Sequence, residues 1–397
     1  MKSGHTPSRS VPAYWENADI PWFTLADVWQ LRDGKQVYLG ETKNKINELG
    51  LANSAAELLP AGTVVLSRTA SVGFSGIMPI PMATSQDFWN WICGPQLLPE
   101  YLNYQFKSMR AVFKSLNMGS THQTIYQKDA ASLEVVVPPL EEQRAITSYL
   151  DRETARIDTL IEEQQRLIEM LRERRDSVWA ARLDEAHSLG RVVTVRRIID
   201  SIADGPFGSS LTSAHYSDDG ARVIRLGNIG VNEFKDEDSA FVPLEYAREL
   251  EAHAVEQGDV VVAGLGDEKM PLGRAAVVPE LGRAIVKADC YRLRPNDQVT
   301  ATYLAWAMSA PQTRAQIMLL ARGSTRARLN TKVVQQVEIP LPERRVQEAL
   351  VGQSAVETAK VDTLMAEAVR FIELSQERRS ALIGAAVTGQ IDARAVT

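Results

Sequence analysis

Two stretches of the sequence carry basic and polar side chains without a single acidic residue: Tyr101–Lys128 and Gln298–Val337. A polyanion binds best where no carboxylate offsets the cations, so both windows are candidate nucleic-acid contacts. Their basic residues are Lys107, Arg110, Lys114 and Lys128, with His122, in the first window, and Arg314, Arg322, Arg326, Arg328 and Lys332 in the second. A single Lys or Arg is more often a solvated surface charge. The interpretation therefore depends on the pairing of the two windows.

Each window also contains the tripeptide Gly-Ser-Thr. Short hydroxyls and backbone amides suit phosphate oxygens, while Arg, Asn, Gln and His can read base edges. We expect the main contacts at Ser120, Thr121 and His122, and at Ser324, Thr325, Arg326 and Arg328. Supporting contacts are expected at Gln123, Lys107, Arg110, Lys114, Arg322 and Lys332. Arg68 and Lys269 follow equivalent strands and are second-rank candidates.

Signatures of catalysis are weak in this sequence. It contains no phosphate-binding loop, no nucleophile elbow and no histidines at metal-ligand spacing, so we expect no catalytic residue, metal or cofactor in this chain. Asp259 with Asp267-Glu268-Lys269 loosely fits a metal-dependent nuclease. A hairpin turn is favoured there, because the first copy has Thr63 and no carboxylate at the same place.

The elements that would position the windows occur twice along the chain. Asn117–Gln143 is similar to Ala321–Arg345, Leu58–Gly73 to Ala254–Gly273, and Ile157–Arg175 to Val361–Arg379. A repeat of this length indicates tandem domains, each a mixed α/β globule followed by one long helix. The predicted fold class is α+β, with internal pseudo-twofold symmetry.

Both predicted helices carry sustained heptads, which favours an antiparallel pair that acts as a rigid spacer. Ile161, Ile168, Met365 and Ile372 widen the apolar stripes and are candidates for binding a partner protein. Burial within the helix pair is nearly as well supported, and dimerisation through the helices stays open.

The remaining composition indicates a cytoplasmic protein. Cys93 and Cys290 fit no disulfide framework, and no apolar run approaches the length of a membrane span. The net charge of −6 does not by itself indicate nucleic-acid binding.

Several stretches together resemble the specificity subunits of type I restriction–modification enzymes. They are SGHTPSRSVPAYWENADIPWFTLADV (Ser3–Val28), DGPFGSSLTSAHYSDDGARVIRLGNI (Asp204–Ile229), GDVVVAGLGDEKMPLGRAAVVP (Gly258–Pro279) and VVVPPLEEQRAITSYLDRETARIDTLIE (Val135–Glu162). Members of this family usually carry a short segment before the stretch that begins at Ser3. Its absence here suggests a truncated sequence, a misassigned start, or a natural variant whose first domain is incomplete.

The resemblance implies two target-recognition domains, 1–140 and 188–342, separated by a central helix, 141–187, and followed by a distal helix and tail, 343–397. Such a subunit binds double-stranded DNA at a split target and two methylation subunits; the sequence leaves open whether restriction subunits join. S-adenosylmethionine would then belong to the methylation subunits, and ATP with Mg²⁺ to the restriction subunits. A structural adaptor that binds proteins through its helices, and the nuclease above, are the alternatives.

Overall fold

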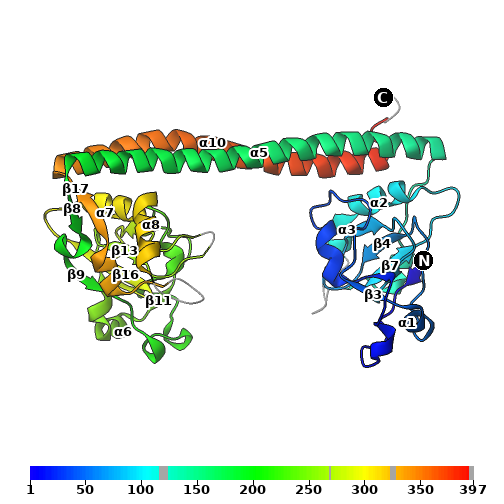
Figure 1. The fold of residues 1–397 in the computed structure, drawn as a ribbon, viewed down its shortest axis with the longest axis horizontal. Coiled ribbons are helices and arrows are strands. Elements are labelled where there is room, and N and C mark those ends of the chain that lie inside the picture. Colours follow the sequence, from blue (N-terminus) through cyan, green and yellow to red (C-terminus); the bar gives the residue numbers. More distant parts are fainter. Residues whose placement is uncertain (116–123, 268–269, 322–327, 393–397) are drawn as a thin grey trace. The chain divides into compact units, whose positions relative to one another are not determined.

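The computed structural model describes residues 1–115, 124–267, 270–321 and 328–392. The chain divides into two compact units, Met1–Arg166 with Ala368–Thr397, here unit 1, and Leu167–Glu367, here unit 2. Helices α5 (Leu140–Leu189) and α10 (Arg344–Val387) each contribute a segment to both units (Figure 1). The boundaries between the compact units therefore fall within both long helices, whereas the domain boundaries predicted from the sequence lie at the helix ends.

Unit 1 contains two sheets that share a buried core. The first is antiparallel and has the order β1 (Lys2–Ser3), β7 (Phe88–Trp91), β4 (Val64–Ser67), β5 (Ser75–Ile77). The second has the order β3 (Asn44–Ile46), β2 (Ile20–Phe23), β6 (Ala83–Thr84), with β2 and β6 parallel. The helices are η1 (Pro12–Tyr14), η2 (Leu25–Leu31), α1 (Glu48–Ala52), α2 (Pro99–Ser108), α3 (Arg110–Ser115) and α4 (Gln127–Ala131).

Unit 2 contains three sheets. Their orders are β14 (Ala275–Val277), β13 (Val260–Ala263), β16 (Cys290–Pro295), β9 (Ile199–Ala203); β11 (Phe241–Val242), β10 (Ala221–Ile224), β15 (Ala284–Val286), β12 (Ala254–Val255); and β17 (Glu338–Leu341) with β8 (Arg191–Thr194). The helices are η3 (Val195–Arg197), η4 (Gly208–Ser210), η5 (Ser213–His215), η6 (Leu226–Asn228), α6 (Leu244–Glu249), η7 (Glu251–His253), α7 (Ala301–Ser309), α8 (Pro311–Leu320) and α9 (Thr331–Gln336).

The two units repeat one topology. The order β1-β7-β4-β5 of unit 1 matches β9-β16-β13-β14 of unit 2, and in both cases every neighbouring pair is antiparallel. The parallel pair β2 and β6 likewise matches β10 and β15. In each unit a helix, α2 or α7, lies between the sheet and the long helices (Figure 1). The predicted fold class, mixed α/β domains joined to long helices, is confirmed.

A buried glutamine near the start of each long helix anchors it to its domain. Gln143 of α5 accepts from Leu98 N at the start of α2 and donates to the Gln96 and Pro138 carbonyls. Gln347 of α10 makes the same three kinds of bond, to Thr300 N at the start of α7 and to the Gln298 and Pro342 carbonyls. Both glutamines are fully buried. Each glutamine therefore satisfies one amide at the N-terminus of a short helix, a group that the helix itself leaves without a partner, and links it to the segment before the long helix.

Within each unit the segments of α5 and α10 run antiparallel. In unit 1, Asp158 Oδ1 lies 3.1 Å from Arg379 Nε, while earlier residues of α5 (Ile146, Tyr149 and Leu150) pack on later ones of α10 (Ile383, Ala386 and Val387). In unit 2, Arg175 pairs with Asp362 at 3.2 Å and Arg182 pairs with Glu357. The predicted antiparallel pairing is therefore present in each unit.

The residues predicted to bind a partner protein fall into two groups. Ile161 and Ile168 are buried, with exposed fractions of 4% and 8%. Their burial fits the alternative expectation, in which they pack within the helix pair. Met365 and Ile372 are half-buried, and partner contact stays a prediction for them. Among the described residues, no helix is both long enough and apolar enough to cross a membrane.

Candidate nucleic-acid interface

Each acid-free window returns to its domain at an equivalent point. Thr124 forms an isolated antiparallel bridge with Thr69, two residues after β4, and Arg328 forms one with Leu265, two residues after β13. Eight predicted contact residues that precede these anchors lie outside the described residues, as does Lys269; the eight are Ser120, Thr121, His122, Gln123, Arg322, Ser324, Thr325 and Arg326. Contacts at these positions stay predictions. The anchors support the pairing of the windows on which those predictions depend.

A carboxylate immediately before the last strand of each main sheet organises the anchor. In unit 1, Asp87 accepts hydrogen bonds from Thr69 and Ser85. In unit 2, Asp289 accepts from Arg328 Nε at 2.8 Å. Both carboxylates lie outside the acid-free windows, so the windows alone do not predict them. Asp87 directly precedes Phe88 and Asp289 directly precedes Cys290, and this shared position before equivalent strands is the sequence feature that could identify them.

Arg328 is held in place while its side chain stays exposed. Its guanidinium carbon lies 5.7 Å from the centroid of the Phe207 ring, and the hydrogen bond to Asp289 raises the pKa of Arg328. Among the described residues, only its Nε makes a hydrogen bond, which leaves both Nη groups available for a bidentate contact. A guanine edge or a phosphate presents two acceptors at the matching spacing.

Asp204 stabilises the backbone at Asp289, the residue that binds Arg328. Its Oδ1 accepts from Gly205 N at 2.7 Å and from Asp289 N at 3.0 Å. Asp289 has a φ of 66°, a left-handed conformation that is uncommon outside glycine. Burial raises the pKa of Asp204. The Asp204 carboxylate therefore helps to fix the backbone from which Asp289 reaches Arg328.

Arg68 lies beside the anchor of unit 1. Its guanidinium carbon is 4.4 Å from the centroid of the Trp89 ring, and its carbonyl accepts from Ile125 N at 2.8 Å, next to Thr124. The stacked position keeps the arginine close to the end of the first window. Its assignment as a DNA contact stays a prediction that this position supports.

The other predicted cations lie on helices of their domains. Arg110 is exposed and stacks 4.8 Å from the centroid of the Phe74 ring, and Lys332 is exposed on α9. Lys114 lies on α3, and its side chain is outside the part of the chain that the structure describes. None of these positions conflicts with a role in binding phosphate.

Lys107 has a different environment from the one that its charge suggests. Its ammonium group donates to the carbonyl oxygens of Gly34 at 2.9 Å and Gln36 at 3.4 Å. Burial lowers the pKa of Lys107 to about 8. A contact between Lys107 and a phosphate would require these bonds to break, so its present role is to hold the loop at Gly34.

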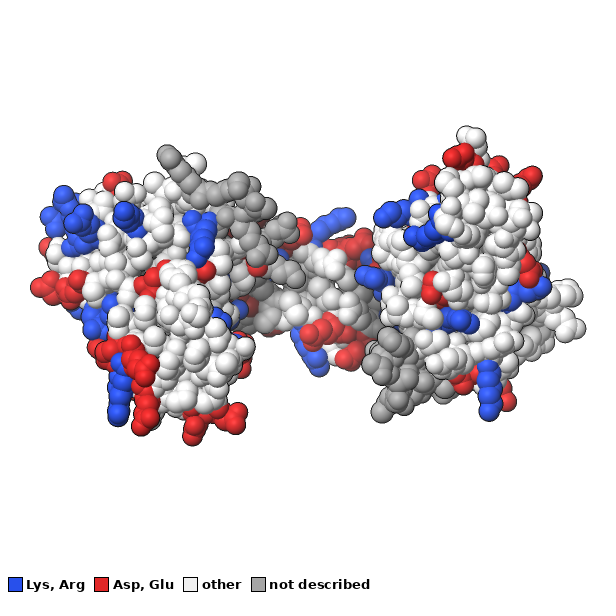
Figure 2. Space-filling model, turned by 90° about the horizontal axis from the view of Figure 1, so that it is seen from below, with Lys and Arg blue, Asp and Glu red and all other residues white. Residues whose placement is uncertain are grey.

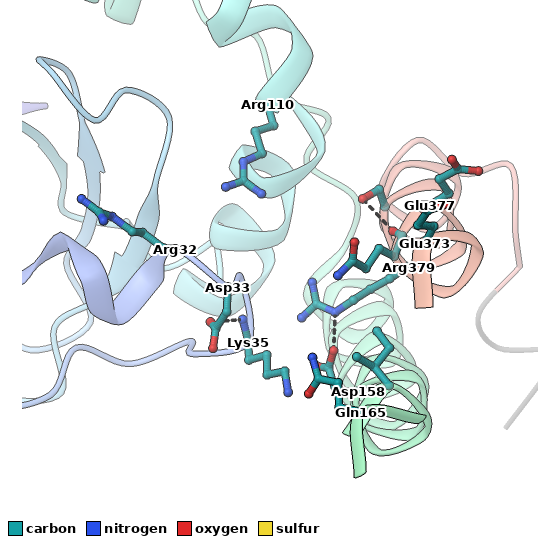
Figure 3. Close-up of a pocket in the computed structure, with 12 residues that line it drawn as sticks. Arg32, Asp33, Lys35, Arg110, Asp158, Gln165, Glu373, Glu377 and Arg379 are labelled. Atoms are coloured by element: carbon teal, nitrogen blue, oxygen red, sulfur yellow. Dashed lines mark hydrogen bonds and ion pairs between the residues drawn. The ribbon is translucent and has the colours of Figure 1, made fainter. Parts of the chain in front are cut away.

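The same loop contacts the long helices of unit 1 beside a cavity of about 980 Å³ (Figure 3). Arg379 Nη2 donates to the Gly34 carbonyl at 2.9 Å, and Lys35 Nζ lies 2.7 Å from Glu162 Oε1. Acidic side chains from α5 and α10 line the cavity together with Arg32, Lys35 and Arg110. The mixture of charges suits docking of the domain on the helices better than binding of a polyanion.

The buried ammonium of Lys107 predicts a pH dependence of stability. Its folded-state pKa of about 8 lies below the ordinary 10.5, so the folded chain releases this proton first. The contribution of Lys107 to stability is therefore lowest below pH 8 and rises between about pH 8 and 10.5. Denaturant unfolding is measured for the wild type and for Lys107→Met from pH 7 to 9.5. The free energy of unfolding of the wild type should rise relative to that of the variant as the pH increases. Parallel pH curves would contradict this assignment.

The carboxylates considered for a nuclease have structural partners. Asp259 is 3% exposed and forms a bidentate pair with Arg294, with both N–O distances 2.9 Å. Asp267 accepts from Met270 N at 2.8 Å in a turn. Among the described residues, no three His, Cys, Asp or Glu side chains are grouped so that they could hold a metal ion.

Asp259→Asn should therefore destabilise unit 2, because it removes the charge of the buried partner of Arg294 and leaves that arginine only its ion pair with the exposed Glu256, at 3.1 Å. We expect the free energy of unfolding to fall by about 2–3 kcal/mol, the scale of charge-assisted hydrogen bonds and broken buried pairs. Urea titrations with and without Mg²⁺ should give the same loss. A loss that appears only with Mg²⁺ would instead indicate a metal ligand.

Charge is not spread evenly over the two domains. In the view of Figure 2, basic and acidic side chains of unit 2 gather in separate clusters, and no single continuous positive surface covers either domain. A chain with a net charge of −6 must concentrate its cations locally to attract DNA. This pattern is consistent with short contacts at the anchored windows.

Comparison with known proteins identifies the family that the sequence resembles. Residues 1–170 match the type I restriction modification DNA specificity domain. The MjaIX specificity subunit of Methanocaldococcus jannaschii is 31% identical over 173 residues, which are 43% of this chain and 38% of that subunit. The MjaVIII specificity subunit of the same organism is 20% identical over 316 residues, which are 73% of this chain and 70% of that subunit.

A solved structure shares the fold of almost the whole chain. It is described as the structural basis of complex assembly and conformational transition of the type I R-M system, and one of its chains aligns with a TM-score of 0.65 at 14% identity. The alignment covers 98% of this chain and 95% of that one. The predicted resemblance to type I specificity subunits is confirmed, because residues 1–170 match their domain and curated relatives of that description align with this chain. The aligned segment spans less than two thirds of the MjaIX subunit.

Proposed function

We propose that this chain is the DNA-recognition subunit of a type I restriction–modification system and reads a target made of two separated parts. The repeat of one topology is the observation that carries the proposal. Unit 1 contains residues 1–166 of the segment that matches the specificity domain, and unit 2 repeats its strand order. Two domains of one kind with different residues at their windows fit two different DNA half-sites.

In this proposal the chain recognises DNA and its partners supply the chemistry. Hydroxyls and cations of the windows bind phosphates, and Arg328 reads a base edge from its place on Asp289. Two methylation subunits would use S-adenosylmethionine, and restriction subunits, where present, would use ATP and Mg²⁺. Exposed apolar side chains of α10, Phe371 and Leu374 in unit 1 and Leu364 in unit 2, are places in each unit where such subunits could dock.

The test compares two arginines of unit 2. Arg328→Ala removes the anchored guanidinium, whereas Arg196→Ala removes an exposed arginine of η3, outside the second window, as a matched control. The complex of the chain with its methylation subunits is titrated with its target DNA and with targets altered in either part. Arg328→Ala should cost about 1–3 kcal/mol of binding and relax selectivity in one part only.

The other outcomes separate the alternatives. An equal loss on every DNA sequence would make Arg328 a phosphate contact. If neither the wild-type chain nor its complex shows DNA affinity that falls with salt, the chain is a structural adaptor and the proposal fails. Arg196→Ala should bind as the wild type does.

A further inference from the structure

A loop tip beside the anchor of unit 2 presents an aromatic ring to solvent. The tip comprises residues 207–210 and lies between the buried Pro206 and the buried Leu211. All four of its residues are exposed, and Phe207 has an exposed fraction of 52%. The Arg328 guanidinium lies over the Phe207 ring, with 5.7 Å between the guanidinium carbon and the ring centroid. A single exposed apolar side chain is common and needs no function, so the surroundings of Phe207 decide whether it has one.

The start of the tip is fixed to the backbone that holds the anchor. Gly205 packs so closely on Lys287 that a Cβ atom would lie 1.9 Å from the Lys287 carbonyl carbon. The Asp204 carboxylate accepts hydrogen bonds from the amides of both Gly205 and Asp289. Asp289 in turn accepts from Arg328. One set of backbone contacts therefore positions the tip and the anchored arginine together.

The end of the tip is fixed as well. The Tyr246 hydroxyl donates to the Ser210 carbonyl, and Leu211 is buried in a cluster that Tyr246 also contacts. Between the two ends the chain turns at Gly208, whose φ of 64° is a left-handed conformation that glycine adopts easily. Because both ends are held, little conformational entropy is lost when a ligand contacts the Phe207 ring.

Unit 1 has a tip at the equivalent place. Strands β1 and β9 occupy the same position in the two main sheets, and each is followed by a glycine, then a buried proline and then exposed residues. At Gly4 and at Gly205 a Cβ atom would lie 2.2 Å and 1.9 Å from backbone atoms of the segment that leads into β7 or β16. The exposed side chains differ, because the tip of unit 1 carries Arg9 where the tip of unit 2 carries Phe207. A shared support with different exposed side chains suits two domains that read different sequences.

We propose that Phe207 is a second specificity-determining residue of unit 2 and contacts the methyl group of a thymine beside the base that Arg328 reads. This inference rests on the proposed function, since it adds a residue to the same DNA interface. In the major groove, arginine pairs with guanine, and apolar side chains, phenylalanine among them, contact the thymine methyl group. A phenyl ring has no hydrogen-bond donor for a phosphate, so its favourable contact must be with an apolar group of the DNA.

The spacing of the two side chains indicates which base pair Phe207 contacts. Base pairs are about 3.4 Å apart, so the 5.7 Å between the Arg328 guanidinium carbon and the Phe207 centroid is less than two steps. The ring therefore reaches the pair next to the guanine. The DNA block read by unit 2 is expected to contain a guanine and a thymine in adjacent base pairs.

Deoxyuridine tests the contact with the wild-type chain, because uracil pairs as thymine does and lacks only the methyl group. The complex of the chain with its methylation subunits is titrated with its target duplex, in which each thymine of the unit 2 block is replaced in turn. Arg328→Ala identifies that block and its guanine, because selectivity relaxes there. One replacement, in the base pair next to this guanine, should weaken binding about fourfold, the scale of one buried methyl group.

Variants of the tip show whether Phe207 makes the contact. Phe207→Ala should bind the thymine and deoxyuridine duplexes equally well at that position. Phe207→Leu keeps an apolar side chain and should still bind the thymine duplex more tightly. Val192→Ala is the matched control, because Val192 has an exposed fraction of 51% and lies on β8, outside the tip. This control should discriminate thymine from deoxyuridine as the wild type does.

The remaining outcomes count against the proposal in distinguishable ways. If no thymine responds to loss of its methyl group, or if Phe207→Ala keeps the wild-type discrimination, Phe207 does not read the DNA, while recognition through Arg328 still stands. An equal loss of affinity by Phe207→Ala on all sequences would make the ring a support for Arg328. Absence of salt-dependent DNA binding by the wild-type complex would refute the proposed function itself.

Discussion

Replacing Gln347 with alanine is expected to lower the free energy of unfolding by about 3 kcal/mol or more, because three backbone groups lose their partner and a buried unsatisfied group costs about 1–3 kcal/mol. Those groups are the Thr300 amide and the Gln298 and Pro342 carbonyls. Gln347 itself is 0% exposed, so water has no ready access to replace the side chain. Urea unfolding followed by tryptophan fluorescence measures the loss.

Two further variants show whether the effect depends on this arrangement. Gln143→Ala removes the equivalent three bonds from unit 1 and should give a loss of similar size. Gln353→Ala removes an exposed glutamine from the same helix as Gln347 and should change stability by less than about 0.5 kcal/mol. Equal small losses from all three variants would show that the buried glutamines do not anchor the helices.

Lengthening both long helices by four residues is expected to abolish recognition of the original DNA target and to select a longer one. Four helical residues add about 6 Å. Base pairs are about 3.4 Å apart, so the unspecified spacer should grow by about two base pairs. Insertions after Gln164 in α5 and after Glu373 in α10 are matched, because each lies six residues from the Asp158–Arg379 pair.

Methylation patterns in cells measure this change. Both half-sites should keep their sequences, because the insertions leave the windows and their anchors untouched. An insertion in α5 alone should disturb the pairing of the helices and reduce methylation at every spacer. An unaltered spacer with the matched insertions would contradict the role of the helices in setting the distance.

Periodicity and repetition in the sequence were sufficient to predict the fold class and the antiparallel pairing of helix segments. The heptad of the first long helix includes Ile157 and that of the second includes Val361; each heptad predicts burial along one face, and both residues are buried. The duplicated stretches predicted two related domains, which the matching strand orders confirm.

Features that depend on contacts between residues far apart in the sequence could not be predicted from the sequence alone. Gln143 looks like any polar residue of a charged helix, and only the fold brings it to the start of α2. Asp289 reaches Arg328 across 39 positions of sequence, so no local pattern pairs them. Lys107 was predicted from its charge alone, whereas its burial beside Gly34 is a tertiary property. Apolar spacing likewise could not tell whether Ile161 and Ile168 face a partner or the helix pair.

We propose that two domains of one chain read two separate pieces of DNA. The most direct measurement is the methylome of cells that express this chain with its methylation subunits, compared with cells that express the Arg328→Ala variant. The proposal predicts one motif made of two short defined blocks with a constant undefined gap, and relaxation of a single block in the variant. One uninterrupted motif, or no new methylation, would contradict it.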